Sequence, residues 1–196
     1  MIDELLEIIK EEVDTFLKLK INDRQDRYIH LSPVVDLEGK PPVNENSVCM
    51  SLIKIEEDRN NMSNGGQTER VGNEFHSYNP PIKLNLVILF SAAYLDGQEK
   101  NYLEGVKRLS LVVSFFQSKN VFTSQNTPRL DPAYGAIKAD FYSLSMEEQN
   151  QLWGMLGGSY RPSVLYRLRA LLIQEKFITR VTPSVTSSQS QVGAKE

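Results

Sequence analysis

The chain has 196 residues, a length that one domain can fill and that is enough to bury a substantial core. Its 40% hydrophobic and 24% charged residues lie near globular averages, which excludes a chain that is disordered throughout. Lys and Arg number 22 against 25 Asp and Glu, and the net charge of −3 excludes a general affinity for nucleic acid or anionic membrane. No apolar stretch approaches the roughly 20 residues of a membrane-spanning helix, so we expect no integral membrane protein.

The cysteine content and the first residues indicate a cellular compartment. The single cysteine, Cys49, cannot form an internal disulfide, and the acidic start of the chain lacks the basic flank of a secretion signal. We therefore expect the protein to fold in a reducing cytoplasm.

The first half of the chain predicts one helix and one strand with polar connections. Apolar residues recur at helical spacing over residues 2–17, which indicates an amphipathic helix. Residues 23–46 carry several prolines and should be mostly loop, with a short extended piece at residues 34–35. Alternation over residues 48–55 predicts a strand. Residues 60–81 hold too few apolar side chains for burial to offset the entropy lost when a segment becomes ordered, so we expect a long exposed loop there.

The middle of the chain predicts the centre of the fold. Residues 82–90 begin as an alternating strand and end apolar on both faces, which is typical of a central strand under a helix. A second helical stripe follows over residues 102–116. Residues 121–122 suit a short extended segment, and residues 137–142 alternate like another strand.

Residues 145–148 predict the start of a helix. Ser145 and Glu148 have the spacing of a capping box, in which each side chain accepts a hydrogen bond from the backbone of the other, and the glycines at 157–158 supply the stop. Trp153 takes a position on the buried side of this helix and should be a core residue. Residues 164–173 then suit a long final strand.

This order contains too few helices to separate every pair of strands. It therefore predicts an α+β fold, with a central mixed or mostly antiparallel sheet flanked by about three helices. We expect the folded domain to span residues 1–176 and a flexible polar tail to span residues 177–196, which are rich in Ser, Thr and Gln.

The motifs of common enzymes are missing from the sequence. It has no nucleophile elbow, phosphate-binding loop or dinucleotide-binding glycine motif. His30 and His76 are not spaced with other ligands as a metal site requires, and Cys49 has no neighbouring base in the sequence. The acidic residues 56–58 suit a solvated charge run. We therefore expect no catalytic residue, no cofactor site, no metal site and no enzymatic activity.

Charge is unevenly distributed along the chain. Residues 159–180 hold five basic side chains and one acid, whereas the preceding part of the chain is acidic overall. This separation suits association of a basic surface with an acidic surface of another copy or of another partner. Alternatively, Arg167 and Arg169 face solvent on one side of the predicted strand, and spacing alone does not choose between the two.

The run Leu-Trp-Gly-Met-Leu-Gly-Gly-Ser-Tyr-Arg-Pro-Ser-Val-Leu-Tyr-Arg-Leu-Arg at residues 152–169 resembles the signature of the cap, or tail-terminator, proteins of phage-tail-like contractile injection systems. The opening helix, the strand at 48–55, the segment at 81–90 and the residues at 109–122 fall in the same order as in that family. The resemblance implies a tail-terminator-like fold. It also implies a structural protein, usually a homohexameric ring, that ends the inner tube and links it to the end of the sheath.

The resemblance also names the partners: further copies of the chain, the inner tube protein and the sheath protein. It places the protein in the bacterial cytoplasm during assembly and then at the end of the contractile particle, inside the cell or released from it. Two alternatives stay open, namely another interaction or baseplate-type module of the same particle and an enzyme with an unrecognised site. The candidate interface residues are Tyr160, Arg161, Arg167, Arg169, Phe177, Thr179 and Arg180.

Overall fold

The structure is a computed structural model that describes residues 1–21, 26–36, 46–58, 67–94, 97–173 and 177–183. Within these residues the helices are α1 (Ile2–Lys20), α2 (Glu99–Ser118) and α3 (Met146–Met155), with a 3-10 turn η1 (Pro132–Tyr134). The strands are β1 (Ile29–Leu31), β2 (Ser47–Glu57), β3 (Gln67–Val71), β4 (Glu74–Tyr78), β5 (Ile82–Ala93), β6 (Val121–Phe122), β7 (Ile137–Tyr142), β8 (Ser163–Ile173) and β9 (Ile178–Pro183).

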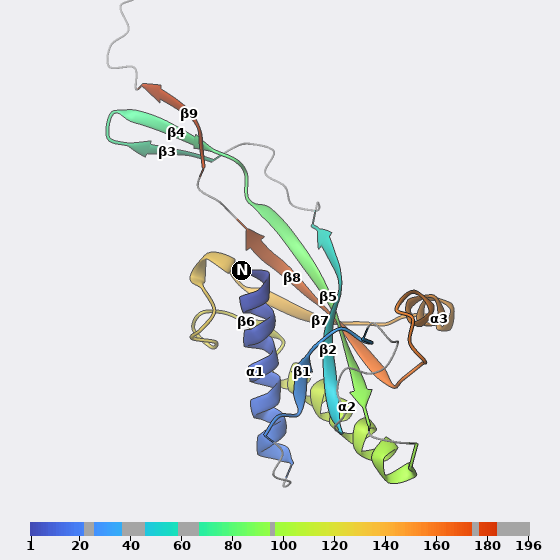
Figure 1. Ribbon diagram of the computed structural model, residues 1–196. Coiled ribbons are helices and arrows are strands. Elements are labelled where there is room, and N and C mark those ends of the chain that lie inside the picture. The colour runs from blue at the N-terminus through green and yellow to red at the C-terminus, as the bar shows by residue number, and fades with distance from the viewer. Residues whose placement is uncertain (22–25, 37–45, 59–66, 95–96, 174–176, 184–196) are drawn as a thin grey trace, which may run out of the picture.

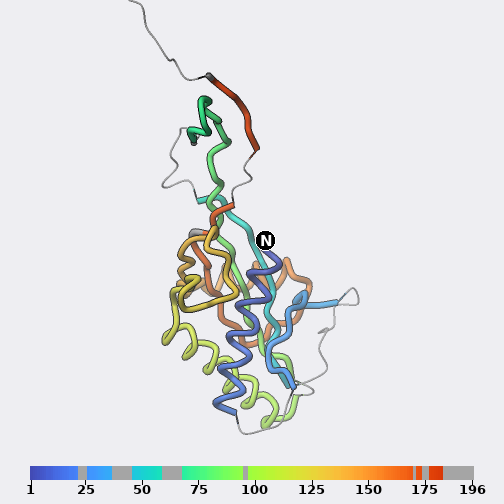
Figure 2. The backbone as a smooth tube through the Cα atoms, turned by 90° about the vertical axis from the view of Figure 1, so that its left-hand side faces the viewer, coloured from blue at the N-terminus to red at the C-terminus, as the bar shows by residue number. Residues whose placement is uncertain are grey.

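The strands form two sheets. A six-stranded sheet has the order β1-β2-β5-β8-β7-β6, and only the β1–β2 pair in it is parallel. A three-stranded antiparallel sheet, β3-β4-β9, extends beyond the end of the body; we call it the arm (Figures 1 and 2). The expected α+β fold with a mixed, mostly antiparallel sheet and three helices is confirmed for the described residues.

The arm continues the centre of the large sheet. β4 leads into β5 and β9 follows β8, so the partners that pair in the body pair again in the arm. Pro80 and Pro81 lie between β4 and β5. Because proline has no backbone N–H, the ladder is interrupted there and the arm is a separate sheet.

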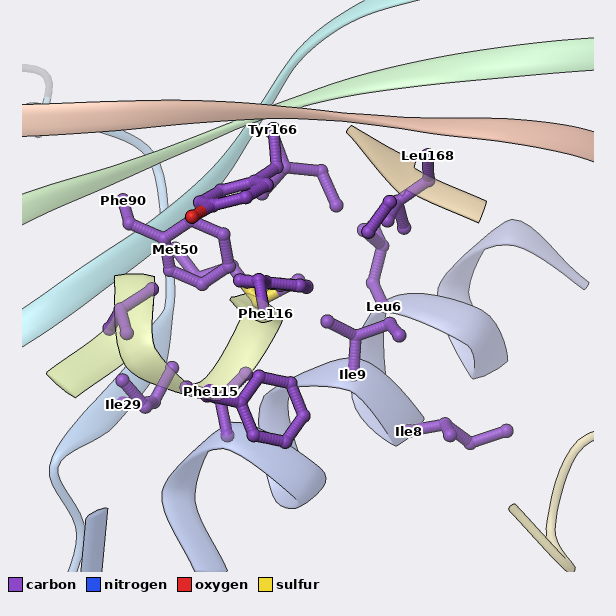
Figure 3. Close-up of a cluster of buried hydrophobic side chains, with 14 of the residues drawn as sticks. Leu6, Ile8, Ile9, Ile29, Met50, Phe90, Phe115, Phe116, Tyr166 and Leu168 are labelled. Atoms are coloured by element: carbon purple, nitrogen blue, oxygen red, sulfur yellow. The ribbon is translucent and has the colours of Figure 1, made fainter. Parts of the chain in front are cut away.

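Helices cover both faces of the large sheet. α1 and α2 pack on one face and form the main core with the inward side chains of β2, β5 and β8. In Figure 3, Phe116 of α2 lies beneath Tyr166 of β8, and the two rings stack with centroids 4.1 Å apart. α3 packs on the opposite face, where Trp153, Val87, Leu89 and Leu165 form a second cluster. Residues 86–93 of β5 are consequently buried throughout, as the sequence predicts.

Both ends of α3 have the features that the sequence predicts. The Ser145 hydroxyl accepts a hydrogen bond from the backbone N–H of Glu148 at 3.2 Å, and the Glu148 carboxylate accepts one from the backbone N–H of Ser145 at 2.8 Å. Gly157 follows with a φ of 70°, a conformation that favours glycine. The predicted capping box is therefore confirmed, and it fixes where α3 begins after β7.

Three expectations differ from the structure. Residues 60–81 contain a β-hairpin at Gln67–Tyr78, because Gly72, with a φ of 62°, and Asn73 form a tight turn between two pairing strands. The early extended piece is β1, while residues 34–35 form a bend. Ile178–Pro183, expected in a flexible tail, form a strand because β4 offers them a backbone ladder; residues 184–196 lie outside the described residues.

One buried carboxylate joins α1 to the start of β1. Asp14 is 8% exposed, and its Oδ1 accepts hydrogen bonds from the backbone N–H groups of Tyr28 at 2.6 Å and Ile29 at 3.0 Å. Its Oδ2 pairs with Lys18 at 2.7 Å. These contacts attach the edge strand to the helix that covers it.

We expect Asp14→Ala to lower the free energy of unfolding by about 2 to 3 kcal/mol, because two buried N–H groups lose their acceptor. Asp14→Asn keeps an acceptor oxygen and should lose roughly half as much. Urea denaturation followed by circular dichroism measures both. Equal losses in the two variants would show that the hydrogen bonds to β1 are not the cause.

Candidate interaction surface

A β-bulge decides which side chains of β2 reach the α3 face. Leu52 pairs with Ile88, but Lys54 rather than Ile53 pairs with Val87, so β2 has one extra residue at this point. Without the bulge, Lys54 and Glu56 would both lie on the face of the sheet that carries the main core. With it, both charged side chains lie on the α3 face.

A second bulge acts in the same way on β8. Leu168 pairs with Leu86 and Leu171 with Leu84, so Arg169 and Ala170 together oppose the single residue Asn85. The extra residue returns Leu171 to the main core, where it is fully buried, while Arg169 stays beside Lys138 of β7 on the α3 face.

The two bulges thereby assemble a line of charges from three strands, β2, β8 and β7, which we call the charged row: Lys54, Glu56, Arg167, Asp140 and Arg169. Lys54 Nζ lies 2.6 Å from Glu56 Oε1, and Arg167 reaches Glu56 Oε2 at 3.6 Å. Arg169 forms an ion pair with Asp140 on the far side. Arg167 also lies over the ring of Tyr142, with 4.4 Å from its guanidinium carbon to the ring centroid.

The charged row borders an apolar groove. The groove has a volume of about 430 Å³ and lies between α3 and the sheet; its apolar lining includes Ile53, Val87, Leu144, Leu152, Met155 and Leu165. Met155 is 71% exposed at this site. An open apolar groove beside a row of fixed charges is a surface suited to binding another protein.

Apart from Asp140 Oδ2, which forms an ion pair with Arg169, three buried polar atoms of the charged row, the strand beside it and α3 have no hydrogen-bond partner among the described residues. They are the side-chain oxygen of Asn85, the Nε of Arg167 and the indole nitrogen of Trp153. Buried polar atoms are nearly always paired, so each of these requires a partner from water or from another molecule. All three belong to the strands and the helix that carry the charged row and the groove.

The predicted interface residues fall in three places rather than one. Arg167 and Arg169 lie in the charged row, where each has an acid of the same chain beside it. Tyr160 and Arg161 lie in the connection between α3 and β8. Tyr160 is 61% exposed and packs edge-to-face on Trp153, and the Arg161 guanidinium lies over the ring of Tyr94.

The remaining predicted interface residues lie at the start of β9 or just before it. Phe177 is 75% exposed, Arg180 is exposed, and Thr179 occupies a bulge opposite β4. The Thr179 hydroxyl donates to the backbone oxygen of Ser77 at 2.9 Å. The charged row itself could not be found from spacing, because its acids Glu56 and Asp140 come from strands distant in the sequence.

The groups considered for chemistry include Cys49 and possible metal ligands. Cys49 is buried, and burial raises the pKa of its thiol, which disfavours the reactive thiolate. Among the described residues, no three His, Cys, Asp or Glu side chains are grouped as a metal site would require. None of the helices in that part of the chain has the length and apolar character of a membrane span.

Comparison with known proteins identifies the family. The family described as Pvc16 N-terminal domain matches residues 5–187. The chain belongs to this family. No curated protein sequence matches it.

Two structures determined by cryo-electron microscopy share the fold of this chain. One is the sheath/tube terminator of PVC, an extracellular contractile injection system, in its extended state, with a TM-score of 0.67 and 16% identity. The other is the tube-terminating cap of the anti-feeding prophage, with a TM-score of 0.62 and 13% identity. The matches cover 96% and 93% of this chain but only 63% and 59% of those chains.

The indole of the domain's single tryptophan reports on how α3 is seated. Trp153 is 4% exposed, so the prediction that it is a core residue is confirmed. We expect Trp153→Ala to cost about 3 to 5 kcal/mol of stability because it leaves a large cavity under α3, and Trp153→Phe to cost much less. Chemical denaturation gives these values. A readily quenched, red-shifted emission from the folded parent protein would contradict the buried position.

The charged row makes the stability of the domain depend on pH. The hydrogen bond from Lys54 holds the pKa of Glu56 below its ordinary value. The ionised carboxylate therefore stabilises the folded state above the unfolded pKa of about 4.3, and this contribution is lost as the pH falls through the lower folded pKa.

We expect Glu56→Gln to be less stable than the parent by under about 1 kcal/mol at pH 7 and equal to it at the acid end of the transition. Lys54→Met should show the same dependence, and the double variant should lose little more than either single variant. Urea denaturation between pH 3 and 7 tests this, and additive losses would mean that the two side chains act independently.

Proposed function

We propose that this domain ends the inner tube of a contractile injection system and links the tube end to the sheath as a ring of identical subunits. The observation that carries the proposal is the fold, which matches the PVC sheath/tube terminator over 96% of this chain with a TM-score of 0.67. The anti-feeding prophage cap, described as tube-terminating, shares the same fold. Family membership over residues 5–187 supports the same conclusion.

The surfaces of the domain suit a structural role. The groove and the charged row offer exposed apolar area beside fixed charges, features that suit contact with a protein partner. Together with the structural roles named for the similar proteins, this favours a protein that is not an enzyme.

The predicted interface residues have distinct places in this proposal. Arg167 and Arg169 hold the charged row together, so Tyr160 and Arg161, at the end of the sheet beside α3, provide the direct contacts to an acidic surface of a neighbour. Phe177, Thr179 and Arg180 belong to or adjoin β9, an edge strand of the arm. An edge strand can pair with a strand of another protein, and we assign this edge to the sheath.

The number of subunits and the cellular location follow from the same reasoning. A terminator must match the cyclic symmetry of the tube that it ends, and six-fold symmetry is what the family resemblance implies. The PVC terminator belongs to an extracellular particle. We therefore propose a homohexamer that assembles in the bacterial cytoplasm and remains at the end of the particle.

Electron microscopy of tubes grown with and without the domain tests the function. We expect the inner tube protein to form tubes of restricted length with a ring of six subunits at one end when the domain is present. Arg161→Glu should leave the melting temperature within a few degrees of the parent and yield longer tubes without rings, whereas Lys107→Glu, an exposed change on α2, should behave like the parent. Tubes that grow as long with the parent domain as without it would refute the proposal.

A further inference from the structure

The two faces of the arm carry opposite charge. In an antiparallel sheet, directly paired residues share a face and neighbours along a strand alternate. Arg70 pairs with Phe75, and Phe75 pairs with Thr182, so these three share one face. Glu69, His76 and Val181 pair in the same way on the other face.

The full register assigns the remaining side chains. The basic face consists of Thr68, Arg70, Phe75, Ser77, Arg180 and Thr182. The acidic face consists of Glu69, Val71, Glu74, His76, Tyr78, Ile178 and Val181. The ion pair between His76 and Glu74, at 3.2 Å, agrees with their common face.

The charges on the basic face are not neutralised by any described residue. In the described part of the chain, no carboxylate forms an ion pair with Arg70 or Arg180, and the basic face carries no acidic residue. The acidic face has two carboxylates, Glu69 and Glu74, against a single histidine. One thin sheet therefore presents two arginines on one side and two glutamates on the other.

The arm also lacks a core. Apolar side chains are exposed on both of its faces: Phe75 is 37% exposed on the basic face, while Val71, Ile178 and Val181 are 46 to 49% exposed on the acidic face. Figures 1 and 2 show no helix over either face of the arm. A small sheet with no apolar layer packed on it is marginally stable by itself, so a covering surface would stabilise it.

We infer that the occupant of both faces is the arm of another copy of this chain: the basic face of one arm packs on the acidic face of the next. Each face carries the charge and the apolar residues that complement the other face. Such a contact is heterologous, because two different surfaces meet, and a heterologous contact forms a ring when the rotation between neighbouring subunits closes on itself. The inference rests on the ring of the proposed function and identifies which surfaces of the subunits meet.

A pair of charge-reversed proteins tests this arrangement. Arg70→Glu with Arg180→Glu makes both faces of the arm acidic, and Glu69→Arg with Glu74→Arg makes both faces basic. Each double variant alone should self-associate at least about tenfold more weakly than the parent, because every contact then joins like charges. A 1:1 mixture of the two should regain the parent's association, because acidic and basic arms alternate.

The control is Lys100→Glu with Lys107→Glu on α2, which changes the net charge as much as the first double variant does and leaves the arm intact. Sedimentation velocity of the full chain at low ionic strength, where surface charges are least screened, measures all the proteins. The control should associate like the parent.

The outcomes separate the two proposals. Double variants that associate like the parent, or a mixture that recovers nothing, overturn the contact between arms even if the parent still forms rings on tubes. A parent chain that stays monomeric at every concentration, including with tube ends present, overturns both the contact and the ring. Association that is lost in each double variant and recovered in their mixture supports the alternating stack of arms.

Discussion

The antiparallel pairing of β5 with β8 is the interaction on which the remainder of the structure depends. It forms the centre of the large sheet, and it continues past Pro80 and Pro81 as the pairing of β4 with β9 in the arm. Because β5 is covered by α1 and α2 on one face and by α3 on the other, its burial ties both helical layers to one strand. Loss of this pair would separate α3 from α1 and α2 and the arm from the body.

The same two strands explain why a charged surface lies so close to a core. Arg167 on β8 opposes the buried Val87 on β5, and the bulge in β2 brings Glu56 to the same face. The helix α3 is short and covers only part of that face, so apolar residues give way to the charged row within a few residues. Stability of the body and recognition of a partner are therefore supplied by neighbouring side chains on the same strands.

The sequence predicted the body of the fold well because its elements carry local signals. A few neighbouring residues are enough to recognise each of these elements: the capping box at Ser145, the apolar stripe of α1 and the apolar run of β5. The hairpin at Gly72 was missed because its strands are polar, although a Gly-Asn pair between alternating segments is a recognised turn signal. The groove and the charged row were not predictable, since they join strands that are distant in the chain through two bulges.

The alternation of side chains along the arm also links the length of the arm to the face on which each charged side chain lies. Adding two residues to each of the paired strands would lengthen the arm by about 7 Å and leave every downstream side chain on its original face. Adding one residue to each would exchange the faces, so that the arginines would point where the glutamates now lie. Arms of different length that keep the same polarity should therefore differ by even numbers of residues, and an odd difference should be accompanied by a compensating bulge.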